Sequence, residues 1–583
     1  MASITDKLFE TERQLQGMVK ASGDIVPVPG ERSDIVSHLD YIIQLLGTMV
    51  TKETYDAGKK KMAAGYNAIQ DRVEAINWLL SSGEISGDVD VEPLTVSENG
   101  EYMPGAGKAY GRIVVDTPID MAPKIIEGTL SEYSSSEVKS IKENFFSNYS
   151  PLTSVSFPAC THIGSKAFAG CSSLTSISFP ACTNIYYSAF YSCSSLTSVS
   201  FPACTSIGTG AFAYCSSLTS VSFPACTVIG EDAFFNCSSL TSASFPVCAK
   251  ISGSAFYSCS SLTSVSFPAC TSIGGSAFSK CTSLTDVSFP VCTNIGSSAF
   301  CSCYSLASIS FPACTNISSN AFYNCSSLTS VSFPACTVIG GSAFCSCSSL
   351  TSVSFPVCTY IGYSAFCSCS SLTSVSFPVC TYIGGCAFYS CTSLTSVSLP
   401  ACTSIGGSAF YSCTSLTSVS LPACTDIGPN AFGYCTSLTS VSFPVCTNIG
   451  GYAFRNCSSL TSVSFPACTS IAASAFILCS SLTSVSFPVC TYIGTYAFDG
   501  CSSLTSVSFP ACTFIGSNAF SRCSSLNEIT LDGQYICGMS NSNAFAGTRI
   551  TGTTGSIYVP ASLYDTYIAS SDWKYFSTRF VSI

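Results

Sequence analysis

Residues 152–173 read LTSVSFPACTHIGSKAFAGCSS, and this 22-residue pattern occurs seventeen times without an insertion up to residue 525. The leading leucine repeats from Leu152 to Leu526, and two further apolar columns keep the same step, from Ile163 to Ile515 and from Phe168 to Phe520. A fixed period of this length is typical of solenoids, in which each unit packs only against its neighbours. The repeat therefore decides the fold.

Within each unit, the segment LTSVSF alternates apolar and polar residues as a strand does, with its serines toward solvent. Ile163 and Phe168 are expected to fill the core from the opposite side, and Gly164 to permit the turn. One coil cannot bury its apolar face alone, so coils should stack about 4.8 Å apart as parallel strands. The prediction is a repeat solenoid with short parallel strands, preceded by an α-helical segment and a small β module.

The spacing of Leu152, Val155, Phe157 and Cys160 resembles the leucine-rich-repeat pattern L-x-x-L-x-L-x-x-[N/C]. The continuation, a proline after the strand and I-G-x-x-A-F-x-x-C before the next leucine, resembles the BspA-type subfamily. This resemblance covers about two-thirds of the chain. It implies a right-handed coil with its strands on the concave face, and the usual role of such proteins as bacterial surface adhesins.

Both ends of the array are expected to be capped. Residues 126–151 form a degenerate repeat in the same register, and a polar outer coil would protect an open strand edge. Residues 526–583 are expected to form capping strands, the final one over 556–560, and a closing helix. The apolar face of that helix is predicted to carry Tyr564, Tyr567, Trp573 and Phe576.

The N-terminal region has a different, more charged composition. Residues 1–82 show helical stripes of apolar residues, which fit either a core or a seam between copies of the chain, so a homo-oligomer is possible. Residues 88–120 are predicted to form a small β module around an N-G turn. The segment 91–116 resembles a module of phage virion (tail-type) proteins. That resemblance implies attachment to other virion proteins through the N-terminal region.

The 39 cysteines form two columns, Cys160–Cys512 and Cys171–Cys523, with a few additional positions. Counterparts in adjacent coils would lie about 5 Å apart, within reach of a disulfide. Cysteine is also a small residue that is often fully buried. We favour a role in the core and expect no metal site, because the C-S-C pairs lack histidine or C-x-x-C spacing.

Composition argues against several functions. Charged residues make up 9% of the chain, and the repeats hold five basic and five acidic residues, so no basic stripe for nucleic acid exists. No apolar stretch is long enough to insert into a membrane, and the N-terminus shows no export signal. His38 and His162 are the only histidines, and no catalytic set can be built from them. We expect no enzyme activity and no cofactor.

Aromatic residues in the variable turns are the candidate ligand contacts, because tyrosine can stack on sugars and donate a hydrogen bond. Alternatively, they only cover the convex side. Repeated weak sites would act through avidity. One column follows the A-F pair and the other precedes the turn isoleucine; together they comprise Tyr191, Phe235, Tyr257, Tyr323, Tyr389, Tyr411, Tyr360, Tyr382, Tyr492 and Phe514.

The preferred hypothesis is a non-enzymatic phage virion structural protein, of the tail or another surface appendage. It would be made in the host cytoplasm and would project the solenoid toward a glycan or protein on the host cell surface. The alternative is a BspA-like adhesin on a bacterial cell surface. The resemblance at 91–116 and the missing export signal favour the virion.

Overall fold

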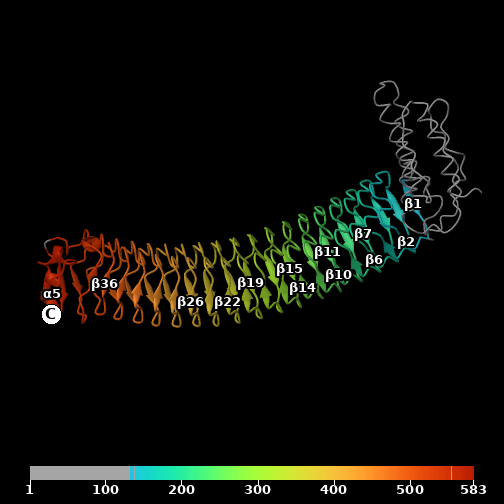
Figure 1. Cartoon of the computed structure of the whole chain (residues 1–583). Coiled ribbons are helices and arrows are strands. Elements are labelled where there is room, and N and C mark those ends of the chain that lie inside the picture. Colours follow the sequence, from blue (N-terminus) through green and yellow to red (C-terminus); the bar gives the residue numbers. More distant parts are fainter. Residues whose placement is uncertain (1–130, 137, 553) are drawn as a thin grey trace, which may run out of the picture. The chain divides into compact units, whose positions relative to one another are not determined.

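The computed structural model describes residues 131–136, 138–552 and 554–583. The predicted helical segment over 1–82 and the predicted β module over 88–120 lie outside the described residues. The chain divides into two compact units, Met1–Phe201 and Pro202–Ile583. Both units contain coils of the predicted parallel-strand solenoid, which is confirmed (Figure 1).

In the first unit, strands of three and two residues alternate along the chain. They are β1 (Glu132–Ser134), β2 (Ser140–Ile141), β3 (Ser154–Ser156), β4 (His162–Ile163), β5 (Ser176–Ser178), β6 (Asn184–Ile185) and β7 (Ser198–Ser200). Tyr133 pairs in parallel with Val155, and Ile141 with Ile163. In each pair the two partners are 22 residues apart in the sequence. The register of the repeat therefore extends one coil before residue 152.

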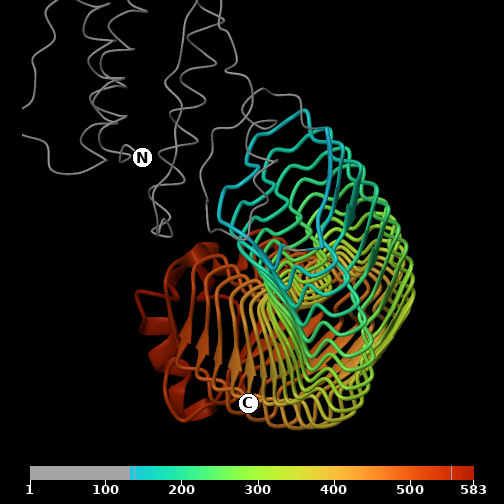
Figure 2. The ribbon, with the colours of Figure 1, turned by 90° about the vertical axis from the view of Figure 1, so that its right-hand side faces the viewer.

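The second unit repeats this arrangement every 22 residues. Its three-residue strands run from β9 (Ser220–Ser222) to β37 (Glu528–Thr530), and its two-residue strands from β8 (Ser206–Ile207) to β36 (Phe514–Ile515). Each two-residue strand pairs in parallel with the next one along the chain, as β20 (Val338–Ile339) does with β22 (Tyr360–Ile361). In Figure 2 the orange and red coils of this unit show their strands side by side and pointing the same way.

The ladder of three-residue strands is interrupted, unlike the ladder of two-residue strands. Breaks follow β5, β17 (Ser308–Ser310), β21 (Ser352–Ser354), β25 (Ser396–Ser398) and β33 (Ser484–Ser486). At the break after β21, the N–H of Thr373 donates to Thr351 O over 3.3 Å, whereas that of Thr351 donates to Thr329 O over 2.9 Å. Hydrogen bonding between coils is therefore more regular on the side of the two-residue strands.

The glycine after the turn isoleucine does not supply the turn conformation, so this prediction is wrong. A Cβ atom on Gly164 would lie 2.7 Å from the backbone N of Glu143 and the carbonyl O of Ile141, in the neighbouring coil. The left-handed positions fall later, at Lys166 (φ 54°) and Gly170 (φ 75°). Gly164 is thus needed for close approach between coils, and the turn bends at residues with positive φ.

Two phenylalanine columns fill the core of the second unit. Phe322 stacks on Phe300 and Phe344 within its own column, with ring centroids 5.3 and 5.2 Å away. It meets Phe311 and Phe333 of the other column at 6.0 and 6.1 Å with the rings steeply inclined. Stacked and edge-to-face pairs are the favourable aromatic geometries, so each ring stabilises both neighbouring coils.

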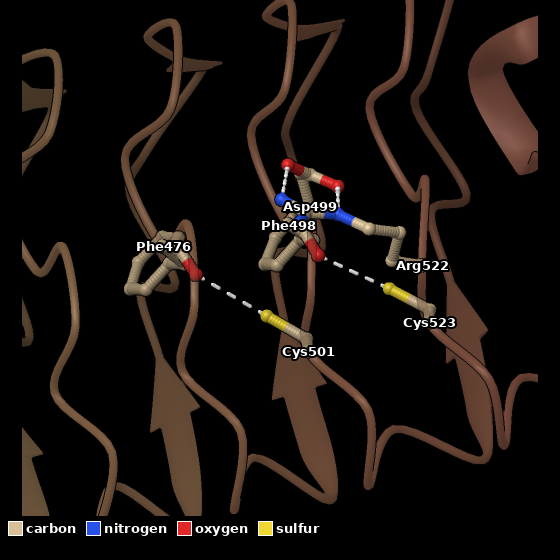
Figure 3. Close-up of polar contacts among 6 residues, drawn as sticks. All are labelled: Phe476, Phe498, Asp499, Cys501, Arg522 and Cys523. Atoms are coloured by element: carbon tan, nitrogen blue, oxygen red, sulfur yellow. Dashed lines mark hydrogen bonds and ion pairs between the residues drawn. The ribbon is translucent and has the colours of Figure 1, made fainter.

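The predicted burial of the cysteines is confirmed. All but four of the 39 are buried, and all 39 are free thiols. In one column the Sγ donates to a phenylalanine carbonyl of the preceding coil, as from Cys501 to Phe476 O (3.2 Å) and from Cys523 to Phe498 O (3.0 Å) (Figure 3). In the other column it donates within its own coil, as from Cys336 to Val338 O at 3.2 Å.

Because these thiols are buried, we expect a disulfide reagent to modify no more than four cysteines in the native protein and all 39 after denaturation without reductant. The measurement is a colorimetric thiol count in buffer and in concentrated guanidinium chloride. A native count far above four would contradict the burial. A low denatured count would instead reveal disulfides.

The C-terminal residues close the core with aromatic side chains. The elements are β38 (Gly538–Met539), η1 (Ser542–Phe545), β39 (Ser556–Val559), η2 (Ala561–Leu563), α5 (Tyr564–Ala569), η3 (Lys574–Phe576) and β40 (Phe580–Ser582). Phe545 stacks on Phe520 with centroids 5.5 Å apart, and Trp573 lies 6.0 Å beyond it. The indole of Trp573 donates to Cys537 O over 2.7 Å, so its polar edge is satisfied although the ring is buried.

Two predictions about this segment are wrong. The strand over 556–560 is not the final one, because β40 pairs with β39 in parallel beyond it. The closing helix is only six residues long, ending at Ala569, and short 3₁₀ turns flank it. Tyr567, Trp573 and Phe576 are buried as expected, whereas Tyr564 is only partly so. Three aromatic anchors already cover the last coil, so a longer helix is not required.

Candidate binding surface

The first predicted aromatic column lies in the turns, directly after the buried core phenylalanine of each coil. Tyr191 and Tyr323 have 40% and 36% of their surface exposed. The other four members of this column are half-buried: Phe235, Tyr257, Tyr389 and Tyr411. All six therefore reach solvent, but four of them only in part.

The half-buried rings stack on one another in pairs. Phe235 and Tyr257 lie with centroids 4.9 Å apart and an interplanar angle of 5°, and Tyr389 and Tyr411 at 5.0 Å and 6°. Their inner faces are therefore occupied by the partner ring and are closed to a sugar. Such a pair can therefore offer a ligand only its ring edges and the hydroxyls of its tyrosines, which are Tyr257 in the first pair and both residues in the second.

The second predicted column occupies the first position of the two-residue strands. Tyr360 stacks on Tyr382 of β24 (Tyr382–Ile383) at 5.3 Å and 13°. Tyr492 of β34 (Tyr492–Ile493) stacks on Phe514 at 5.7 Å and 4°. The three tyrosines are 38–43% exposed, so this column is more open than the half-buried pairs of the first one.

A positively charged side chain lies close to each stacked ring pair of the first column. The sequence did not lead us to predict these cations. We call the two resulting groups the aromatic–cation arrays. Array A comprises Tyr214, Phe235, Tyr257 and Lys280, and array B comprises Tyr389, Tyr411, Tyr434, Tyr452 and Arg455. Tyr214, Lys280 and Tyr434 each stand one residue after a position of the predicted column, Tyr452 stands three residues before one, and Arg455 stands within the column. Reading neighbouring columns together would have revealed both arrays.

In array A, Tyr214 inclines against Phe235 at 5.4 Å, and the Lys280 ammonium lies 5.1 Å from the Tyr257 ring centroid. A hydrogen bond between Lys280 and Tyr257 raises the pKa of Lys280. The lysine therefore stays charged at neutral pH.

In array B, Tyr434 inclines against Tyr411 at 5.2 Å. The Arg455 guanidinium lies 5.2 Å from the Tyr434 ring centroid and 5.7 Å from that of Tyr452. Guanidinium groups held against aromatic rings in this way are pre-oriented for bidentate contact with an anion. Burial raises the pKa of the Tyr411 hydroxyl, so it remains a hydrogen-bond donor.

The two array cations differ from Arg522, which is neutralised. Arg522 forms a two-bond ion pair with the buried carboxylate of Asp499 (Figure 3). Within the described residues, neither Lys280 nor Arg455 has a carboxylate partner. Arrays A and B therefore place positive charge over tyrosine rings, in repeats that contain few other charged residues.

The other polar residues singled out by the sequence form no larger cluster. His162 contacts the hydroxyl of Thr161 at 2.7 Å and stacks against Tyr186 at 6.2 Å. Burial and the neighbouring Glu231 raise the pKa of Asp232. Among the residues that the structure describes, no group of three histidine, cysteine or acidic side chains is placed to hold a metal ion. The described helices are too short or too polar to cross a bilayer.

The repeats match a family model described as BspA type Leucine rich repeat region, over residues 139–253, 249–372, 359–476 and 447–565. No curated protein matches the chain. A leucine-rich repeat protein from Bacteroides ovatus is 30% identical (TM-score 0.47), with 56% of this chain and 82% of that chain covered. A leucine rich cell surface protein from Faecalibacterium prausnitzii is 22% identical (TM-score 0.26), with 70% and 86% covered. These TM-scores are low, so the family assignment rests on the family model.

Proposed function

We propose that this chain, which belongs to the BspA-type leucine rich repeat family, is a non-enzymatic bacterial surface protein that binds a host-surface glycan. The observation that carries this proposal is the pair of aromatic–cation arrays, in which Lys280 and Arg455 lie over tyrosine rings without a carboxylate partner among the described residues. An acidic saccharide fits them best. Its carboxylate would accept hydrogen bonds from the cation, and its hydroxyls would pair with the phenols.

Surface placement is the part of the proposal that the family suggests, since BspA-like proteins usually act as adhesins. The rival role in a phage virion rests on the segment 91–116, which lies outside the described residues. Labelling intact bacteria and purified virions from one culture with an antibody to the solenoid separates the two. Labelled cells and unlabelled virions are expected, and the reverse pattern would overturn surface placement.

Removing the array cations is expected to weaken glycan binding. We expect Lys280→Ala and Arg455→Ala each to lower affinity about tenfold, because a hydrogen bond to a charged group contributes roughly 1.5–3 kcal/mol. The double variant should lose more, because two weak sites on one rigid protein bind with avidity. The measurement is binding of the full chain to an array of acidic and neutral glycans.

Lys250→Ala is the matched control, because Lys250 is an exposed cation of β12 (Lys250–Ile251) outside the arrays. It should bind like the parent protein. Equal losses in all three single variants would mean that only net charge matters. Binding by neither parent nor variants to any acidic glycan would contradict the proposed ligand.

A further inference from the structure

Four thiols differ from the rest of the cysteines because they are only half-buried. They are Cys301, Cys345, Cys367 and Cys386. The first three follow the A-F pair in their coils, where other coils carry the residues of the first aromatic column. Accessibility sets these four apart from the core cysteines, which are closed to reagents.

Cys345 and Cys367 occupy the same position in adjacent coils. The backbone holds these positions together: Phe344 N donates to Ala365 O, and Ser346 N donates to Cys367 O, each over 2.7 Å. Each thiol lies beside the hydroxyl of the next residue, Cys345 Sγ at 3.7 Å from Ser346 Oγ and Cys367 Sγ at 3.6 Å from Ser368 Oγ, so the two side chains share the same local geometry. Parallel neighbours about 5 Å apart lie within the Cα range of a disulfide.

The other half-buried thiols lack such a partner position. The counterparts of Cys301 in the coils before and after it are Ser279 and Tyr323. Cys386 belongs to a different column, and its counterparts in the coils before and after it are Ser364 and Ser408. Cys345 and Cys367 are therefore the one accessible pair in register among the described residues.

The core columns also place thiols in adjacent coils, but they are arranged differently. Cys347 and Cys369, next to the pair, donate to the carbonyls of Phe322 (3.2 Å) and Phe344 (3.1 Å) instead of to each other. Both have no exposed surface, and burial raises their pKa values. They are thus neutral and shielded from oxidants at neutral pH.

We propose that Cys345 and Cys367 are a site of reversible oxidation, at which a small-molecule disulfide converts the two thiols into one disulfide linking adjacent coils. The Cys367 thiolate attacks a sulfur of the disulfide RSSR, which releases one thiolate RS⁻ and leaves a mixed disulfide. The Cys345 thiolate then attacks the Cys367 sulfur and releases the second RS⁻. The two protons of the cysteines end on two RSH, so two thiols are oxidised and one RSSR is reduced.

The order of attack follows from the different pKa values of the two thiols. The interaction with Cys345 lowers the pKa of Cys367 to about 6, whereas the interaction with Cys367 raises the pKa of Cys345. Cys367 is therefore the thiolate at neutral pH and reacts first. This inference does not depend on glycan binding, and each can fail without the other.

The test uses the full reduced chain incubated with oxidised glutathione, followed by alkylation and non-reducing peptide mass spectrometry. We expect the native thiol count to fall by two, and one crosslinked peptide to join Cys345 with Cys367. Cys345→Ser should instead trap glutathione on Cys367. Cys301→Ser is the matched control and should leave the crosslink unchanged. A trivalent arsenical, which bridges two close thiols, should bind once to the parent and to Cys301→Ser, and should not bind to Cys345→Ser.

Two outcomes would overturn the proposal. One is a native chain that keeps both thiols, or carries two separate glutathione adducts, under conditions where Cys345→Ser does trap glutathione. The other is crosslinking of core cysteines to the same extent as the pair. Circular dichroism of Cys345→Ser checks that the variant is folded. The arsenical result on the parent chain does not depend on any variant.

Discussion

Raising the pH above 9 is expected to unfold the solenoid in a steep transition. Burial raises the pKa values of Cys226, Cys248 and Cys336 from 9.0 to about 12, and most core thiols shift in the same direction. Between pH 9 and about 12 the folded chain retains protons that the unfolded chain loses. The free energy of unfolding therefore falls as pH rises through this window, and it is unaffected by these thiols below it.

The number of thiols makes this effect large. One buried thiol in this window contributes a slope of about 1.4 kcal/mol per pH unit, and the total stability of a folded domain is only about 5–15 kcal/mol. With tens of such groups, less than one pH unit above 9 should suffice. Far-UV circular dichroism against pH in the presence of reductant measures the transition.

A matched variant tests the cause of the alkaline transition. Replacing Cys226, Cys248 and Cys270 by alanine removes three titrating core groups from one column. Urea unfolding at pH 7.5 gives the cost of the lost packing, and the pH slope of stability should become less steep. A parent protein that stays folded at pH 11 would contradict the burial of its thiols as neutral groups.

Phe322→Ala is expected to produce the largest effect of a single substitution in the repeats. The ring is fully buried and contacts four other phenylalanine rings, two in each column. Truncating such a side chain costs about 3–5 kcal/mol, because the apolar contacts are lost and a cavity remains. In a solenoid the lost stability weakens the two interfaces between this coil and the coils before and after it.

Hydrogen exchange measured by mass spectrometry should show where the Phe322→Ala solenoid opens. Amides within about two coils of residue 322 should exchange faster, and those around Phe454 should not change. Tyr323→Ala is the control, since Tyr323 is the adjacent residue but is 36% exposed. Its effect should be about 0.5 kcal/mol or less. Equal effects of the two variants would contradict the assignment of Phe322 to the core.

The coil could be predicted from sequence because its core obeys one strict rule. The strand alternation placed Val155 and Phe157 inside, and the 22-residue step fixed which residues stack, such as Ile141 on Ile163. The turns follow a different rule. Residues such as Lys166 and Leu478 adopt positive φ because inter-coil hydrogen bonds hold them there, although neither residue type favours it. Local propensity therefore pointed to Gly164 instead.

The candidate surface was predictable only column by column. Each column of the repeat reports one position in every coil, so Tyr389 and Tyr411 were identified together. Contacts between columns depend on side-chain direction in the turns, which the repeat does not encode. For this reason Tyr434 and Tyr452, which flank Arg455, were missed. The stacking of the ring faces was missed for the same reason.

The inter-coil contacts have a consequence for how this protein can change over generations. Thr351 binds the coil before it as Thr329 does, and Cys347 binds Phe322 as Cys325 binds Phe300. An in-frame loss or gain of 22 codons therefore brings together two surfaces that already fit. Near-identical repeats also invite such unequal recombination. The length of the solenoid can thus change by mutation in steps of about 4.8 Å, while the packing of the core stays the same.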